Sequence, residues 1–314
     1  MSLLDNEENL YKRQHYVSHG YLRHFAVKHE GKANFQICAF QKKEHRLFVT
    51  GVNKVSYKKG CYNVTTRDDP KYWEKYFSKE IEPAYVSALD YVISKVVMTR
   101  RGLPILTDTD KQAIGKLIAF QIMRIPSFMD NRIDEGLEIG STFWTSLQKK
   151  YGSRISKNQA DRISEYILKE GGIKDLYLEN ISSETNLERY SNVLRDRTWL
   201  LLCNNTSMPF ITSDNPVLVY SAINITNPSS NGGIGLFDAN IYYPISPKVM
   251  LYIVPRWIID LKCGVDDRHF LDNEELDIVH GVNEKQYHHA TMQVYCSPLY
   301  EKEFAGYLRQ SQRL

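Results

Sequence analysis

The spacing of hydrophobic positions changes twice along the chain, which divides it into three predicted regions. Between residues 34 and 66, short apolar runs alternate with turn residues, as in a small set of β-strands. From residue 71 to 170, apolar residues recur every three to four positions, the spacing of amphipathic helices. The last third again contains short β-branched and aromatic runs. The pattern predicts an α+β fold with a small N-terminal β unit, a helical middle layer and a C-terminal, mostly antiparallel sheet.

Prolines and capping residues place the boundaries of the predicted helices. Pro83 lies inside an apolar helical pattern and predicts a kink or a restart, because proline removes a backbone donor. Asp108-Thr109-Asp110 is a suitable N-cap cluster for a second helix, and Pro126 is expected to end that helix. Residues 14–26 carry apolar side chains at helical spacing and predict a short helix.

Residues 1–314 are predicted to form one unit with an internal weak point. The glycine pair at 171–172 predicts a sub-boundary between residues 171 and 184. This boundary would separate residues 1–170, with the first strands and the helical layer, from residues 184–314, with the C-terminal sheet. The prediction is also compatible with one hydrophobic core that both parts share.

Composition restricts the class of protein. Apolar residues make up 42% of the chain and charged residues 25%, which excludes disorder over most of its 314 residues. No run approaches the roughly 18 apolar residues of a membrane helix, and the acidic N-terminus lacks the apolar core of a secretion signal. The five cysteines form no C-x-x-C pair, which argues against a zinc ribbon and a disulfide framework. We therefore expect a cytoplasmic protein that does not associate with membranes.

The net charge is only +3, but basic residues are concentrated between positions 42 and 67. They are Lys42, Lys43, Arg46, Lys54, Lys58, Lys59 and Arg67, with Glu44 as the one acid and with Phe48, Tyr57 and Tyr62 between them. Basic residues interleaved with aromatic ones can follow a phosphate backbone and stack bases. Lys54 and Lys58 are therefore candidate contacts to a nucleic acid. The alternative is an ordinary solvated hairpin face.

Two polar residues fall on the apolar stripe of the second predicted helix. Gln121 follows Ile118 by three residues and Leu117 by four, and Arg124 comes three residues after Gln121. An arginine at a buried position must be paired, because an uncompensated buried charge costs several kcal/mol. Asp214 is one candidate partner.

Glu82 is the other candidate partner of Arg124. In a structural interpretation, the arginine ties the helical layer to the sheet. In a functional interpretation, Arg124 holds a phosphate or carboxylate in a cleft, because its planar fork suits both groups.

Further candidates lie in two short polar stretches about two hundred residues apart. Asp214 and Asn215 stand between two strand-like segments, where they either cap a turn or present a base and a positioning group. His15 is a candidate general acid or base beside Asp214. His15 and His19 are four residues apart and would share a helix face, but no H-E-x-x-H motif is present, so the sequence gives only a weak indication of metal.

Several standard chemistries are missing from the sequence. It contains no G-x-G-x-x-G fingerprint, no Walker loop, no G-x-S-x-G elbow and no kinase motif set. We therefore predict no cofactor.

Five segments in order along the chain resemble the motifs of one family. They are Gln14-His15-Tyr16-Val17 with Tyr21-Leu22-Arg23-His24-Phe25, then Gln121-Ile122-Met123-Arg124-Ile125-Pro126, Thr212-Ser213-Asp214-Asn215-Pro216-Val217, Tyr243-Pro244-Ile245-Ser246-Pro247, and Val282-Asn283 with Val294-Tyr295-Cys296-Ser297. This set resembles the proteins grouped as domain of unknown function 4238. One departure is Ser18-His19, where the family usually has Pro-Gln.

The resemblance implies no settled activity. The frequent occurrence of the family in bacteria, often in variable gene neighbourhoods, implies a defence or toxin-like role by analogy only. His15, Gln121, Arg124, Asp214 and Asn215 recur in the family motifs, and the polar positions selected by burial and periodicity are among them.

Three hypotheses follow. In the first, the protein is a nuclease-like enzyme acting on nucleic acid or nucleotides: Arg124 holds a phosphate, His15 and Asp214 transfer protons, and Gln121 and Asn215 position the substrate. In the second, it is a non-catalytic interaction or regulatory protein with a protein partner, and the same residues form a buried polar network.

The third hypothesis is a metal-dependent hydrolase that uses His15, His19 and Asp214. Whether the protein is an enzyme at all stays open at this point.

Overall fold

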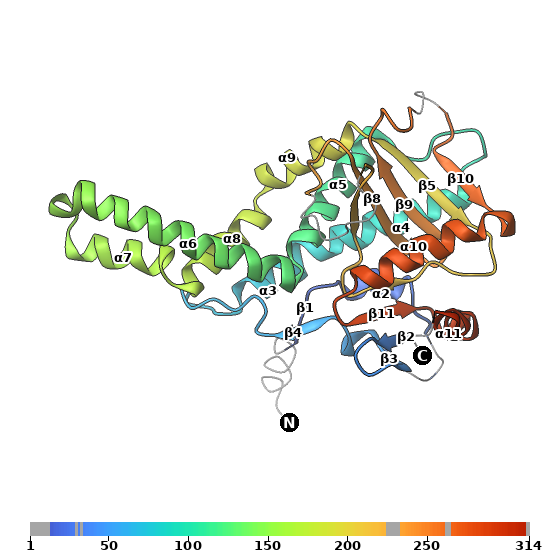
Figure 1. The fold of residues 1–314 in the computed structure, drawn as a ribbon, viewed down its shortest axis with the longest axis horizontal. Helices are drawn as coiled ribbons and strands as arrows, with labels where there is room; N and C mark the ends of the chain where they lie inside the picture. The colour runs from blue at the N-terminus through green and yellow to red at the C-terminus, as the bar shows by residue number, and fades with distance from the viewer. Residues whose placement is uncertain (1–12, 29–30, 32–33, 224–232, 261–264, 312–314) are drawn as a thin grey trace.

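The computed structural model describes residues 13–28, 31, 34–223, 233–260 and 265–311. The acidic N-terminal residues and Cys263 lie outside these ranges. The predicted α+β class is confirmed, because helices fill the middle of the chain and the last third supplies most of the strands (Figure 1). Within the described ranges, no helix combines the length and the apolar character needed to cross a membrane.

The largest sheet has five strands in the order β10-β5-β9-β8-β7. Its members are β5 (Thr198–Asn204), β7 (Leu218–Ser221), β8 (Ala239–Ser246), β9 (Val249–Val254) and β10 (Arg268–Leu271). β10 runs parallel to β5, and the other three pairings are antiparallel. The predicted C-terminal, mostly antiparallel sheet is therefore confirmed.

The predicted N-terminal β unit is not independent. Its hairpin belongs to a four-stranded sheet of order β3-β2-β11-β6. The members are β2 (Gln36–Gln41), β3 (Arg46–Gly51), β6 (Thr212–Ser213) and β11 (Gln293–Cys296). The four central residues of β2 are buried, and a two-stranded hairpin cannot bury a strand on its own. Strands from the last third complete the sheet.

The predicted helix over residues 14–26 is only partly correct. The segment begins as β1 (Arg13–His15), which pairs antiparallel with β4 (Tyr57–Lys59). A short helix, α2 (His19–Arg23), follows after the cap residue Ser18, whose side chain accepts a hydrogen bond from the backbone of Gly20. Helical spacing could not reveal β1, because its strand partner is distant in sequence.

Two long helices cover the sheet. α3 (Tyr72–Tyr76) continues through a π-helical turn (Phe77–Ile81) into α4 (Glu82–Met98), which has Pro83 in its first turn. The predicted restart at Pro83 is thus confirmed. α5 (Asp108–Met123) starts with a capping box, whose cap is Thr107.

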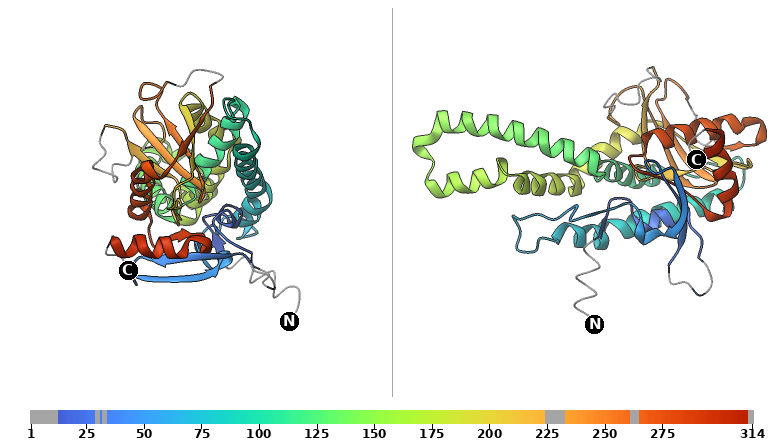
Figure 2. Two further views of the ribbon diagram at one scale, coloured as in Figure 1. Left: turned by 90° about the vertical axis from the view of Figure 1, so that its right-hand side faces the viewer. Right: turned by 60° about the horizontal axis from the view of Figure 1, so that its bottom comes forward.

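A long helical arm projects from the body of the protein (Figures 1 and 2). It consists of α6 (Pro126–Tyr151), α7 (Lys157–Ile167) and α8 (Glu170–Ser182). Pro126 does stop the preceding helix, but it also starts the next one, because proline is favoured in a first turn. α9 (Glu184–Arg195) then returns to the body and packs along α5.

The remaining elements are short or lie near the C-terminus. The helices are α10 (Leu276–His289) and α11 (Glu301–Gln310), and the 3₁₀ turns are Val52–Lys54, Gly152–Arg154, Asn273–Glu275 and Pro298–Tyr300.

Both hydrophobic cores combine distant parts of the chain. The larger core runs from Tyr16 to Tyr295 and joins the N-terminal segment, the helices and one face of the five-stranded sheet. The smaller core runs from Cys38 to Leu308. The sub-boundary expected between residues 171 and 184 falls on α8 and the first residue of α9.

Glycines allow the helices of the arm to approach each other closely. A Cβ atom at Gly140 of α6 would lie 2.1 Å from the carbonyl oxygen of Ile167 in α7. At Gly172 of α8, it would lie 2.3 Å from the carbonyl oxygen of Glu165. Both neighbours are backbone atoms, which cannot move aside as a flexible side chain can.

We expect Gly140→Ala to lower the free energy of unfolding by about 1–3 kcal/mol, because the added methyl group forces α6 away from α7. The matched control is Gly281→Ala in α10, where a Cβ would meet no atom within 4 Å. This control should be neutral or stabilising by up to about 1 kcal/mol, since alanine favours helix. Thermal and urea unfolding followed by circular dichroism measure both. Equal effects of the two changes would contradict the close-packing argument.

Candidate functional site

Arg124 is the centre of a buried polar network at the end of α5. Its side chain is 2% exposed, and each of its three guanidinium nitrogens donates a hydrogen bond. Nε donates to the hydroxyl of Tyr62 (3.1 Å), Nη1 and Nη2 both donate to Oε1 of Glu82 (3.0 Å each), and Nη2 also donates to the carbonyl oxygen of His15. Of the two predicted partners of Arg124, Glu82 is therefore confirmed and Asp214 is wrong.

The electrostatics of this network favour the charged form of Arg124. Burial alone lowers the pKa of the guanidinium, but nearby Tyr62, Glu82 and Glu74 raise it above its ordinary value. Burial also raises the pKa of Glu74 to about 8, against the opposing influence of Arg124. Arg124 therefore stays charged at neutral pH.

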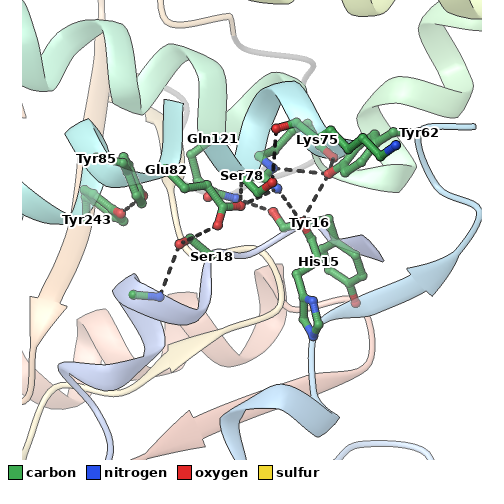
Figure 3. Close-up of polar contacts among 12 residues, drawn as sticks. His15, Tyr16, Ser18, Tyr62, Lys75, Ser78, Glu82, Tyr85, Gln121 and Tyr243 are labelled. Carbon is green, nitrogen blue, oxygen red and sulfur yellow. Dashed lines mark hydrogen bonds and ion pairs between the residues drawn. The ribbon is translucent and has the colours of Figure 1, made fainter. Parts of the chain in front are cut away.

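Two glutamines attach the N-terminal segment to the same region. Gln121 lies one turn before Arg124 and donates to the carbonyl oxygen of Tyr16 (2.8 Å). Gln14 accepts a hydrogen bond from the backbone of Tyr62 (2.6 Å) and donates to Asn63 (2.6 Å). In Figure 3, Gln121 and Glu82 lie together above Tyr16 and His15 of the N-terminal segment.

Asp214 is a second buried centre, separate from Arg124. Its carboxylate is 1% exposed and accepts three backbone hydrogen bonds, from Thr291 (2.9 Å), Met292 (2.7 Å) and Gln293 (3.1 Å). Burial raises the pKa of Asp214 to about 6, and these three donors oppose that rise. The carboxylate therefore fixes the turn that leads from α10 into β11.

The rest of the Asp214 motif is attached to α10. Gln286 donates to the Ser213 hydroxyl and to the carbonyl oxygen of Asn215 (3.0 Å). Asn283 accepts a hydrogen bond from the backbone amide of Ile211 (3.0 Å) and donates one to the carbonyl oxygen of Pro209. These contacts of Asn215 run through its backbone, whose amide also donates to the Ser213 hydroxyl oxygen (3.0 Å).

The two histidines near the N-terminus form a different kind of arrangement. The rings of His15 and His19 lie 3.8 Å apart between centroids, and Tyr57 lies 5.7 Å from His15. The Nε2 atoms of both histidines are buried without a hydrogen-bond partner in the described structure. Burial is the largest cause that lowers the pKa of His15 to about 3, and it also lowers the pKa of His19. Both rings are therefore neutral at pH 7.

The predicted proton-transfer pair is not joined by a hydrogen bond in the described structure. The Asp214 carboxylate accepts its three hydrogen bonds from backbone groups at residues 291–293, whereas His15 contacts His19 and Tyr57. In Figure 3, the His15 ring points away from Glu82. Among the described residues, no group of three or more histidine, cysteine, aspartate or glutamate side chains is placed to hold a metal ion.

The predicted basic residues lie next to the histidine pair. Lys58 is on β4, which pairs with β1 so that His15 stands opposite Tyr57. Lys54 and Lys58 are both exposed, and Lys58 forms an ion pair with Asp130 of α6 (3.0 Å). The structure therefore brings His15, Gln121, Arg124 and the basic strand together, and it places Asp214 and Asn215 directly after β6, where their contacts go to α10 and the turn after it.

Sequence reasoning missed several members of these networks. Tyr62 was expected among the aromatic residues that could stack bases, but it is buried and accepts a hydrogen bond from Arg124. Glu74 carries no recognisable pattern, so only the fold could reveal it. Gln286 was detectable, because it follows Val282 by four residues and Val279 by seven on the buried face of α10. This is the same signal that identified Gln121.

Comparisons with known proteins give one match. A family model described as "Protein of unknown function (DUF4238)" matches residues 13–299. No curated protein and no solved structure matches the chain.

We expect Arg124→Lys to lower the free energy of unfolding by about 1–3 kcal/mol, because a lysine keeps the charge beside Glu82 but can satisfy only part of the contacts to Glu82, Tyr62 and His15. Arg132→Lys is the matched control, since Arg132 pairs with Glu135 at the surface and should change stability by less than about 1 kcal/mol. Urea denaturation measures both. Unchanged stability of Arg124→Lys would exclude a structural role for the guanidinium.

His15 predicts a pH dependence of stability. Its pKa of about 3 in the folded protein is below the ordinary 6.5, so the unfolded chain binds more protons between these values. Stability contributed by neutral His15 is therefore present above pH 6.5 and is lost as the pH falls towards 3, by at most about 1.4 kcal/mol per pH unit. The free energy of unfolding, measured from pH 7 to 4, should fall less steeply for His15→Asn than for wild type. Exposed His288→Asn is the control, and parallel curves for wild type and His15→Asn would contradict the prediction.

Proposed function

The chain belongs to the DUF4238 family, and we propose that it is a non-catalytic interaction or regulatory protein whose motif residues form a buried structural network. One observation carries the proposal: the hydrogen-bonding groups of Arg124 and the carboxylate of Asp214 are occupied by partners inside the protein. A charged side chain that binds a substrate must direct its hydrogen-bonding atoms towards that substrate. Freeing Arg124 from Glu82 would leave a buried charge unpaired, at a cost of about 3–5 kcal/mol.

The position of the Arg124 network, at the base of the helical arm, indicates that it supports the arm. Arg124 stands two residues before Pro126, where the arm begins. Tyr177 of α8 donates to the carbonyl oxygen of Met123 (2.6 Å), and Lys58 of β4 pairs with Asp130 in the second turn of α6. These contacts fix the root of the arm against the body. We propose that the network holds the arm in a constant direction so that it can engage a protein partner.

The cysteines support a cytoplasmic location for the proposed interaction protein. Cys38, Cys61, Cys203 and Cys296 are all buried as free thiols in the described structure. Unpaired buried thiols are typical of proteins from reducing compartments.

The second candidate function is a nucleic-acid-processing enzyme centred on the histidine pair. The specific observation in its favour is the pair of unpartnered Nε2 atoms of His15 and His19, because buried polar atoms without partners need an explanation. The guanidinium of Arg13 lies 5.0 Å from the centre of the Tyr57 ring, and Lys54 and Lys58 are exposed nearby. This surface would supply backbone contacts to a nucleic acid.

One experiment separates the two candidates. Purified wild type, Asp214→Ala and the double variant His15→Asn, His19→Asn are incubated with labelled tRNA, single-stranded RNA and DNA, with and without EDTA. The interaction role predicts no turnover by wild type. It also predicts that Asp214→Ala is destabilised by about 1–3 kcal/mol in total, because three partly buried backbone donors lose their acceptor.

Turnover by wild type that is lost in the double histidine variant, with its melting temperature preserved, would overturn the proposal in favour of the enzyme. Sensitivity of that turnover to EDTA would then indicate a metal-dependent reaction.

A further inference from the structure

We propose that the exposed face of α6 binds the α6 face of a second copy of this chain, with the two helices antiparallel about a twofold axis near residue 142. This inference goes beyond the proposed function, because a homodimer is compatible with an interaction protein and with an enzyme. It rests on the distribution of apolar and charged side chains along the arm. We call this surface the arm face and define it by Glu135, Glu138, Ile139, Thr142, Phe143, Ser146, Lys149 and Lys150.

The arm face lies opposite the surface that α6 uses inside the arm. The inner surface carries buried Ile133 and Gly140, and Gly140 approaches α7. The arm face repeats every three to four residues from position 135 to 149, the spacing of helices that pack side by side in coiled coils. All eight of its side chains are exposed. α6 has 26 residues and is therefore about 39 Å long, which is enough for a helix–helix interface.

The centre of the arm face is apolar. Ile139 is 69% exposed and Phe143 is 54% exposed, and they are four residues apart on the same side of the helix. Two hydroxyl groups beside them are already satisfied, because Thr142 donates to the carbonyl oxygen of Glu138 (3.1 Å) and Ser146 donates to that of Thr142 (3.0 Å). Covering this patch would therefore remove apolar surface from water without breaking these bonds.

Charge is separated along the arm. Towards the body, residues 130–138 contain four acids and one base, namely Asp130, Asp134, Glu135 and Glu138 with Arg132. Towards the tip, residues 149–162 contain five bases and one acid, namely Lys149, Lys150, Arg154, Lys157 and Arg162 with Asp161. On the arm face itself, two glutamates stand at the body end and two lysines at the tip end.

This polarity selects a second copy of the arm in the antiparallel orientation. A twofold axis at residue 142 places Glu135 opposite Lys149 of the other copy, because both are seven residues from the axis. Ile139 and Phe143 of the second copy then meet within about 3 Å along the helix axes. Opposite charges meet at both ends of such an interface, whereas a parallel pair would oppose like charges. The interface is isologous, as expected of a closed dimer.

The apolar centre is tested with a matched pair of variants. Sedimentation velocity and light scattering over a concentration series should show wild type in a monomer–dimer equilibrium. Phe143→Ser should weaken dimerisation by about tenfold or more. Phe237→Ser, at a phenylalanine that is 71% exposed on the body, is the control and should leave the equilibrium unchanged. Melting temperatures close to wild type verify that the variants remain folded.

The charges are tested by reversal and exchange. Glu135→Lys with Glu138→Lys makes the body end basic, and Lys149→Glu with Lys150→Glu makes the tip end acidic. Each double variant alone should dimerise more weakly than wild type, because like charges then meet at both ends. A mixture of the two should form a heterodimer, since each basic surface now faces an acidic one. Lost Arg132–Glu135 pairing in the first variant has little effect, because both side chains are half exposed.

Two outcomes would overturn the proposal. One is a wild type that stays monomeric at every concentration, and the other is a mixture of reversed variants that fails to form heterodimers while both variants are folded. A monomeric wild type that binds RNA, with the binding lost in the tip-reversed variant, would assign the basic tip to nucleic acid instead.

Discussion

The ion pair between Arg124 and Glu82 is the constraint on which the N-terminal half of the fold depends. The arginine ends α5, and the glutamate begins α4 directly after a π-helical turn. The same guanidinium also reaches the backbone of His15. Three elements that are distant in sequence are therefore joined by one charged group. Since the charge cannot be left unpaired in the interior, the positions of these elements cannot be changed independently.

Asp214 has the corresponding role at the four-stranded sheet. Its carboxylate collects three successive backbone donors and sets the entry into β11, the strand that joins β2 to β6. Without β11, the N-terminal hairpin would have no sheet to join. The two charged centres thus connect the beginning, the middle and the end of the chain. The larger core includes residues from all three regions, and the smaller core joins the N-terminal hairpin to the last third of the chain.

The site residues show how far sequence reasoning extends. Periodicity alone placed Gln121 and Arg124 at buried positions, and both are buried. The alternative partner Glu82 was already among the candidates, but the preference between Glu82 and Asp214 depended on which element faces the end of α5. His15 and His19 do lie beside each other, but the shared helix face predicted from their spacing is wrong, because His15 belongs to β1 and His19 starts α2. The family motifs include these positions without indicating what each residue contacts.

The sequence by itself determined the α+β class, the mostly antiparallel C-terminal sheet and the restart at Pro83, because each depends on local periodicity or on the backbone chemistry of one residue. Only the tertiary structure decided that β2 and β3 join β11, that Pro126 opens a projecting arm, and that Asp214 binds backbone amides rather than Arg124. These outcomes depend on contacts between residues far apart along the chain. Such contacts are decided by which buried groups find partners in the folded protein, and local spacing carries no information about that choice.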